Sequence, residues 1–311
     1  MRDRPLHPDA GQVDNRSSFL KDRSPCMQAN LISADELETL IQSNEIIVCD
    51  CRFALNDPDA GRAAFEGSHI PGACYVDLER DLSGQITSST GRHPLPDVGD
   101  WINQASALGL TSGQKIVVYD HGPGVFAARL WWMLGWIGVD DVWLLDGGFA
   151  SWSKSGKSTI AGEATAELPS SHLTSLREVN DLKADADEIL KSLGGGVVSV
   201  VDAREPPRFS GEVEPLDAKA GHIPGAINYH FALSLENGQF RSRAELKEIF
   251  DQVTAGRNPQ NIIHSCGSGV TACHNLFAME YSGIKGSRLY PGSWSEWIAD
   301  PSRPIETSFE K

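Results

Sequence analysis

The chain contains an internal repeat, and this repeat restricts the possible folds more than any other feature of the sequence. The segment 142–152, VWLLDGGFASW, matches the segment 287–297, SRLYPGSWSEW, which begins 145 residues later. A second motif, His-Ile-Pro-Gly-Ala, occurs at 69–73 and again at 222–226. Because the motifs keep the same order in both halves, we infer that one folding unit is used twice.

Short apolar runs alternate with helix-like segments in both halves. The expected strands lie at 46–50, 115–119, 142–145, 197–202, 261–264 and 288–290. Such runs, rich in β-branched residues, are typical of strands that are buried on both faces of a sheet. The alternation predicts an α/β fold for each half, with a mainly parallel sheet and helices on both of its faces.

Changes in composition predict the domain boundaries. Residues 1–30 are expected to form a disordered extension, because the first 26 are rich in Arg, Asp, Pro and Ser and lack an apolar core. The first domain is expected at 31–153 and the second at 175–305. Between them, the segment 154–174 is rich in Ser, Gly, Ala and Thr and is predicted to be the linker.

The stretch 262–276 combines an apolar run, a glycine-containing loop with the sequence CGSGVTA, and a helix-like segment. In a strand–loop–helix arrangement, the loop amides and the helix N-terminus stabilise negative charge on the first loop residue, here Cys266. Gly267 and Gly269 allow the backbone to turn tightly around the sulfur. Cys266 is therefore the predicted nucleophile, whereas Cys273 lies within the predicted helix and is expected to be packed.

The repeat also indicates which half is active. At the 145-residue offset, Cys266 aligns with His121, which follows Asp120, so the first half has no nucleophile at this position. Loops at the carboxyl ends of strands are the usual ligand sites of open α/β sheets. The residue six positions after the cysteine is Ala272 rather than the arginine of cysteine phosphatases, which argues against phosphate-ester chemistry.

Two histidines and two arginines are predicted to be structural. His69 and His222 each precede an Ile-Pro-Gly turn, and the motif is present in both halves, with and without the cysteine. Arg52 and Arg204 likewise recur two residues after an aspartate in each half. Because these residues do not distinguish the active half from the inactive one, we expect them to stabilise turns.

The loop CGSGVTA at 266–272 resembles the active-site loop of the 3-mercaptopyruvate sulfurtransferases, within the rhodanese family. The resemblance extends to YPGSWSEW at 290–297 and to both His-Ile-Pro-Gly motifs, and it covers about 31–305. It implies two tandem rhodanese-like domains, a non-catalytic first and a catalytic second, with the active site in the cleft between them. It also implies that Cys266 carries sulfur as a persulfide.

The implied reaction moves sulfane sulfur from 3-mercaptopyruvate to a thiol, a thioredoxin-like protein or cyanide. The backbone amides of the loop would hold the persulfide, and Ser268 resembles a serine that relays the proton to the departing carbon. The residues expected to provide these amides are Gly267, Ser268, Gly269, Val270 and Thr271. The acidic partner of the serine is expected to be Glu79, with Asp77 as the alternative.

The donor carboxylate is expected to bind an arginine. Arg208, in an Arg-Phe-x-Gly segment, resembles the carboxylate-binding arginine of the family. A second arginine of the family corresponds to Leu216 here, so Lys219 is considered as a substitute point charge.

Two alternative functions stay open: a thiosulfate sulfurtransferase, and a persulfide carrier without turnover of a small donor. The uncharged Gly267 and Ser268 argue against the first, because thiosulfate is a dianion.

The overall charge and the cysteine pattern exclude several classes of partner. The formal net charge of −15 argues against nucleic acid and anionic membranes as partners. The six cysteines fit neither a dense disulfide framework nor the spacing of a zinc site. We therefore expect no metal and no other cofactor, reduced thiols and a cytoplasmic location.

Overall fold

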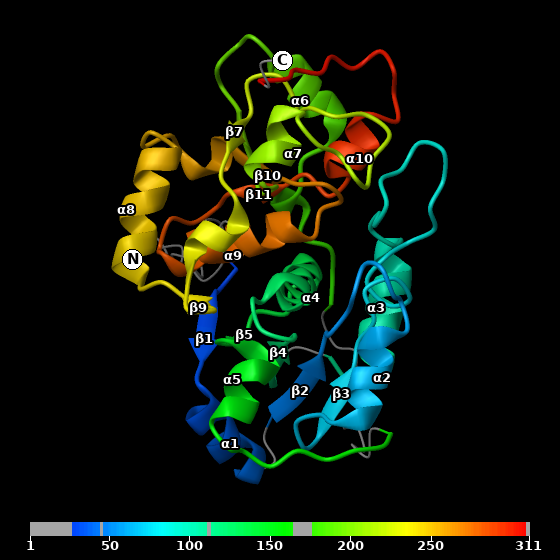
Figure 1. Cartoon of the computed structure of the whole chain (residues 1–311), viewed down its shortest axis with the longest axis vertical. Helices are drawn as coiled ribbons and strands as arrows, with labels where there is room; N and C mark the ends of the chain where they lie inside the picture. The colour runs from blue at the N-terminus through cyan, green and yellow to red at the C-terminus, as the bar shows by residue number, and fades with distance from the viewer. Residues whose placement is uncertain (1–26, 44–45, 111–112, 164–175, 309–311) are drawn as a thin grey trace, which may run out of the picture.

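The computed structural model describes residues 27–43, 46–110, 113–163 and 176–308. In Figure 1, two α/β units lie one above the other along the longest axis, the first below and the second above. This arrangement confirms the predicted fold of two similar domains with parallel sheets. Residues 1–26 and 164–175, which contain most of the predicted N-terminal extension and half of the predicted linker, lie outside the described residues.

The first unit is built on a five-stranded sheet in the order β1-β5-β4-β2-β3, and each pair of neighbouring strands is parallel. The strands are β1 (Asn30–Ile32), β2 (Ile46–Asp50), β3 (Ala73–Tyr75), β4 (Lys115–Tyr119) and β5 (Val142–Leu145). The helices are α1 (Ala34–Ser43), α2 (Ala60–Gly67), α3 (Val98–Ala107), α4 (Val125–Trp136) and α5 (Gly148–Lys154). Side chains of α3 and α4 pack on one face of the sheet, and those of α1, α2 and α5 pack on the other.

The second unit has a four-stranded parallel sheet in the order β11-β10-β6-β7. Its strands are β6 (Ser199–Asp202), β7 (Ile227–Asn228), β10 (Ile262–Ser265) and β11 (Arg288–Leu289), and β8 (Leu235–Glu236) and β9 (Gln239–Phe240) form a separate antiparallel ribbon. The helices are α6 (Ala186–Ser192), α7 (Pro206–Ser210), α8 (Arg243–Val253), α9 (Thr271–Tyr281) and α10 (Ser293–Trp297), with short 3-10 turns η1 (Asn180–Leu182), η2 (Phe231–Ser234) and η3 (Pro259–Asn261). Side chains of α6 and α10 cover one face, and those of α8 and α9 cover the other.

The two units share one hydrophobic core through α4 and α9. These helices are buried on nearly all sides, and they lie together in the centre of Figure 1. Trp131 of α4 meets Phe277 of α9 edge to face, with ring centroids 5.0 Å apart. The tryptophan-rich helix α4 is therefore part of the packing between the two domains.

The histidines of the two His-Ile-Pro-Gly turns have matching surroundings. The Nδ1 atom of His69 lies 2.7 Å from the carbonyl oxygen of Phe65, and its ring stacks on the Phe65 ring. His222 makes the same pair of contacts with Phe209, at the same distance of 2.7 Å. Arg52 and Arg204 likewise bind Asp50 and Asp202, so the structural role predicted for all four residues is confirmed.

None of the helices in the described part of the chain is long and apolar enough to span a bilayer.

Candidate active site

Cys266 lies at the carboxyl end of β10, in the loop that leads into α9. The thiol is buried, and its Sγ atom accepts a hydrogen bond from the N–H of Gly269 at 3.1 Å. Gly269 has a φ of 80°, and a Cβ atom there would lie 2.2 Å from the carbonyl oxygen of Pro291. Only glycine fits this position, and the tight loop brings an amide to the sulfur.

A second loop holds the cysteine loop in place. The N–H of Cys266 donates to Ser293 Oγ at 3.0 Å, and Ser293 Oγ donates to the carbonyl of Tyr290 at 2.9 Å. The N–H groups of Trp294 and Ser295 donate to the carbonyls of Cys266 and Gly267. Ser293 adopts a φ of 52°, which is unfavourable for a residue other than glycine. These hydrogen bonds fix that conformation and so support the reactive loop.

Asp120, not His121, occupies the position of Cys266 in the first domain. The sheet register pairs Asp50 with Tyr119 and Asp202 with Ser265, so the residues that follow Tyr119 and Ser265 are equivalent. The alignment at 145 residues was therefore wrong by one position at this loop, because the repeats differ in length between the strand and the later motif. The prediction that the first domain lacks a nucleophile here is unaffected, because aspartate is not a thiol.

The carboxylate of Asp120 is itself held by loop amides. Its oxygens accept hydrogen bonds from the N–H groups of Gly122, Gly124 and Phe126 at 2.9, 3.0 and 3.0 Å. Burial raises the pKa of Asp120, and these hydrogen bonds act in the opposite direction. The loop of the first domain therefore also directs backbone amides at an acidic side chain, here its own carboxylate.

Ser268 forms a hydrogen bond with a histidine of the first domain. Its Oγ atom lies 2.8 Å from Nδ1 of His93, which is in the loop between β3 and α3. Burial, with smaller contributions from the nearby cations of Arg129 and Arg92, lowers the pKa of His93 to about 3. The imidazole is therefore neutral at ordinary pH and can act as either a donor or an acceptor toward Ser268. His93 was not among the residues predicted from the sequence.

The two acidic residues proposed as partners of Ser268 are engaged differently. Asp77 is buried, and its Oδ1 atom accepts the N–H groups of Glu79 and Arg80 at 2.8 and 3.0 Å. Its Oδ2 atom accepts the hydroxyl of Tyr75 at 3.3 Å. Glu79 is exposed. Within the described part of the chain, no hydrogen bond joins either carboxylate to Ser268, so the pair that the structure brings together is Ser268 and His93.

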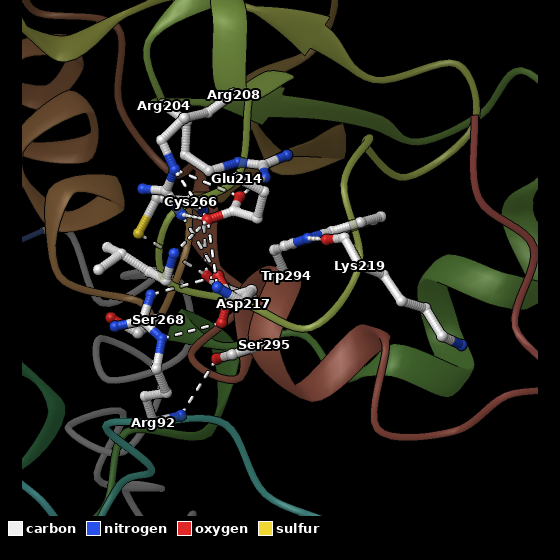
Figure 2. Close-up of polar contacts among 12 residues, drawn as sticks. Arg92, Arg204, Arg208, Glu214, Asp217, Lys219, Cys266, Ser268, Trp294 and Ser295 are labelled. Atoms are coloured by element: carbon white, nitrogen blue, oxygen red, sulfur yellow. Dashed lines mark hydrogen bonds and ion pairs between the residues drawn. The ribbon is translucent and has the colours of Figure 1, made fainter. Parts of the chain in front are cut away.

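Two arginines converge on Gly267, the residue after the cysteine. A Cβ atom at Gly267 would lie 2.8 Å from Nη2 of Arg92 and 3.4 Å from Nη2 of Arg208. Arg208 comes from α7 in the second domain, whereas Arg92 comes from the first domain and was missed by the sequence analysis. Figure 2 shows both side chains beside the loop, while the Lys219 side chain extends away from Cys266. Leu216 is 46% exposed.

A fully buried arginine of α4 supports the reactive loop from the first domain. Arg129 donates to the carbonyls of Gly269, Leu82 and His93 at 3.1, 3.2 and 3.2 Å. Burial lowers the pKa of Arg129, and the neighbouring thiols of Cys273 and Cys266 oppose this. One side chain thus ties the loop to the histidine segment.

The remaining loop residues connect the site to α9. Val270 precedes the helix, Thr271 is its first residue, and the N–H of Cys273 donates to the carbonyl of Val270. Cys273 is fully buried, and its Sγ atom donates to the carbonyl of Gly269. Burial raises the pKa of Cys273 to about 12. Cys273 is therefore an unreactive packed thiol, as predicted. The described residues contain no group of three or more His, Cys, Asp or Glu that could hold a metal ion.

Comparison with known proteins identifies the family. The model of the rhodanese-like domain matches the chain twice, at residues 33–155 and 185–300. The chain is 45% identical to a probable 3-mercaptopyruvate sulfurtransferase of Pseudomonas aeruginosa, over 90% of this chain and 98% of that protein. It is 38% identical to the putative thiosulfate sulfurtransferase SseB of Mycobacterium tuberculosis, over 88% and 96%.

Solved structures give the same result. The 3-mercaptopyruvate sulfurtransferase from Leishmania major superposes with a TM-score of 0.76 at 30% identity and covers 88% of this chain and 75% of its own. SseA from Escherichia coli, described as a 3-mercaptopyruvate sulfotransferase, gives a TM-score of 0.72 at 32% identity, over 85% and 98%. The resemblance inferred from the loop is confirmed, and this chain belongs to the rhodanese family.

Proposed function

We propose that the chain is a sulfurtransferase that takes sulfane sulfur from 3-mercaptopyruvate onto Cys266 and passes it to a thiol acceptor. The observation that carries the proposal is the placement of the Cys266 thiol beside a loop amide, next to a serine that is hydrogen-bonded to a neutral histidine. A relative from Pseudomonas aeruginosa is named a probable 3-mercaptopyruvate sulfurtransferase and one from Escherichia coli a 3-mercaptopyruvate sulfurtransferase, which supports this donor.

In the first half-reaction, the Cys266 thiolate attacks the donor sulfur, and an S–S bond forms as the C–S bond breaks. The bonding electrons stay with the donor carbon, which becomes the enolate of pyruvate. The proton of the donor thiol is transferred to that carbon, so the products are pyruvate and the Cys266 persulfide anion. With the His93 proton on Nδ1, His93 donates to Ser268, and the serine hydroxyl is free to pass a proton to the carbon.

Asp120 indicates how the persulfide would be held. The path Cβ–Cγ–Oδ of aspartate has the same number of bonds as the path Cβ–Sγ–Sδ of a persulfide. Counted onward from the matched residues Asp120 and Cys266, the amides that hold Asp120 correspond to those of Ser268, Val270 and Ala272. The Gly269 N–H already contacts Sγ, where the first domain has Pro123. We expect these amides to bind the terminal sulfur and to stabilise its negative charge.

In the second half-reaction, an acceptor thiolate attacks the terminal sulfur and regenerates the Cys266 thiolate. Small thiols, thioredoxin-like proteins and, in an assay, cyanide are the proposed acceptors, and the kinetics are expected to be ping-pong. We also propose a cytoplasmic location, where such thiols are abundant. The five cysteines in the described part of the chain are all free, in keeping with this location.

Thiosulfate is the second candidate donor, because the structure places two arginines beside a loop whose own residues are uncharged. Arg92 and Arg208 both lie beside Gly267. The site therefore contains charged groups, although the loop residues themselves are uncharged. The relative named as a putative thiosulfate sulfurtransferase is in keeping with this donor. A persulfide carrier without turnover is the third candidate.

The test is thiocyanate formation from each donor, with Cys266→Ser as the blank. We expect kcat/KM for mercaptopyruvate to exceed that for thiosulfate by at least about tenfold, which corresponds to about 1.4 kcal/mol in transition-state stabilisation. A higher kcat/KM for thiosulfate would identify thiosulfate, and not mercaptopyruvate, as the donor. If neither donor turns over and the isolated protein is one sulfur atom heavier by mass spectrometry, the carrier hypothesis is correct instead.

A further inference from the structure

A carboxylate of the chain already lies between the two arginines at the cysteine loop. Asp217 accepts hydrogen bonds from Nε and Nη2 of Arg92, at 2.9 and 3.3 Å. Its Oδ2 atom also accepts from Nη2 of Arg208 at 3.3 Å. The Asp217 side chain is only 3% exposed, whereas those of Arg92 and Arg208 are 29% and 16% exposed. The two guanidinium groups thus form an anion site that an internal carboxylate fills (Figure 2).

This anion site spans the two domains. Arg92 is anchored to the second domain by its N–H, which donates to Ser295 Oγ at 3.1 Å. The N–H of Ser295 in turn donates to the carbonyl of Gly267. Arg92 therefore has a fixed position relative to the residue that follows Cys266, although it belongs to the other domain.

The charges at the site are balanced, which bears on how an anionic donor can enter. Arg208 also binds Glu214 at 2.7 Å, and Arg204 binds Glu214 and Asp202. Three guanidinium groups thus face three carboxylates, counting Arg92 and Asp217. A donor carboxylate that joined this cluster with Asp217 in place would meet no unpaired positive charge, and would be repelled by the Asp217 carboxylate.

We propose that Asp217 occupies the binding site of the donor carboxylate, and that the donor binds by displacing the Asp217 side chain from Arg92 and Arg208. In this proposal, which rests on the proposed function, Arg92 of the first domain is the second arginine of the carboxylate clamp. Arg92 supplies the positive charge that the family's second arginine would provide at the position of Leu216. The donor must then bind both domains at once.

The backbone around Asp217 is suited to such an exchange. The N–H groups of Leu216 and Asp217 donate to Oε1 of Glu214 at 3.0 and 3.2 Å. These hydrogen bonds hold the backbone independently of the Asp217 side chain, and Glu214 stays paired with Arg208. The side chain can therefore rotate away without unfolding the segment that carries it, and Arg208 keeps one partner throughout.

The test uses pyruvate, which has the carboxylate but no sulfur, and measures its binding by calorimetry. The background is Cys266→Ser, so the result does not depend on turnover. We expect Asp217→Asn to tighten pyruvate binding about fivefold, because the amide pairs less strongly with the arginines and does not repel the ligand. We expect Arg92→Gln to weaken binding about tenfold. Arg80→Gln removes the same charge from an exposed arginine of the first domain and is expected to leave binding unchanged.

Three binding results would overturn the proposed displacement of Asp217. If Asp217→Asn binds pyruvate no more tightly than its parent, or if Arg92→Gln binds as well as Arg80→Gln, the displacement model is overturned. Absence of pyruvate binding in all variants also overturns it. Thermal unfolding of each variant identifies any loss caused by misfolding, and Arg92→Lys then tests whether charge without bidentate geometry restores part of the affinity. Failure of the proposed function is a separate result, in which the wild type binds pyruvate but does not turn over mercaptopyruvate.

Discussion

The pairing of Ser268 with His93 makes a prediction that depends on the donor. With mercaptopyruvate, the leaving carbon must gain a proton, whereas thiosulfate leaves as sulfite and needs none. A positioned proton-transfer group contributes about 10²–10⁴-fold to a rate. The single 2.8 Å contact to a neutral imidazole favours the lower end, so Ser268→Ala should reduce kcat/KM for mercaptopyruvate about 100-fold, or about 2.7 kcal/mol. With thiosulfate, the same variant should lose less than about threefold, since only a packing contact is removed.

The assay is steady-state thiocyanate formation with each donor, for Ser268→Ala, His93→Gln and the double variant. Because the two residues act as one unit, the double variant should be no slower with mercaptopyruvate than Ser268→Ala. The pH profile is a further check. Burial keeps the pKa of His93 at about 3, so it stays neutral from pH 5 to 9 and should give no inflection near the ordinary histidine value. Equal losses with both donors would refute the relay and leave Ser268 as a packing residue.

Three further predictions concern the loops and the buried histidine of β10. Gly269→Ala should abolish sulfur transfer and lower the free energy of unfolding by more than about 1 kcal/mol, because of its positive φ and the contact with Pro291; urea unfolding and the activity assay would show this. Asp120→Ala should leave three amides without an acceptor and lower the free energy of unfolding, measured in urea, by about 2–4 kcal/mol. The activity of the folded variant should stay near that of the wild type. A loss of activity would contradict a purely structural role for Asp120. Burial lowers the pKa of His264 to about 3, so this histidine binds a proton more readily in the unfolded state than in the folded state. The free energy of unfolding should therefore be highest above pH 6.5 and should fall as the pH drops toward 3. Each pH unit should remove about 1.4 kcal/mol, and His264→Gln should remove this part of the slope in urea unfolding between pH 7 and 5.

The sequence was sufficient where a pattern is local or repeated. The two rhodanese-like domains follow from the repeat, and the loop at Cys266 follows from its glycines and the strand before it. The edge strands β1, β3 and β7 were missed because runs of two or three residues carry too little periodicity. The alignment of Cys266 with His121 failed because hydrogen-bond register, not motif spacing, decides which loop residues are equivalent.

The parts of the site that come from the first domain could not be found from local patterns. His93 is 175 residues from Ser268, and Arg92 is 125 residues from Asp217. The packing of the two domains, with α4 against α9 at its centre, brings these pairs together. The segment GRHPLP at 91–96 does contain a histidine between an arginine and a proline, but nothing in its composition links it to the cysteine loop.

Arg129 gives a reason why a domain without a nucleophile has been retained after duplication. Its guanidinium group belongs to the first domain, yet it holds the carbonyl of Gly269 in the reactive loop and the carbonyl of His93 in the segment that reaches Ser268. Through these hydrogen bonds, the first domain fixes the conformation of the reactive loop of the second. Selection for the chemistry of the second domain therefore also acts on a buried residue of the first. A second domain expressed alone would lack the Arg129 hydrogen bond that holds the carbonyl of Gly269.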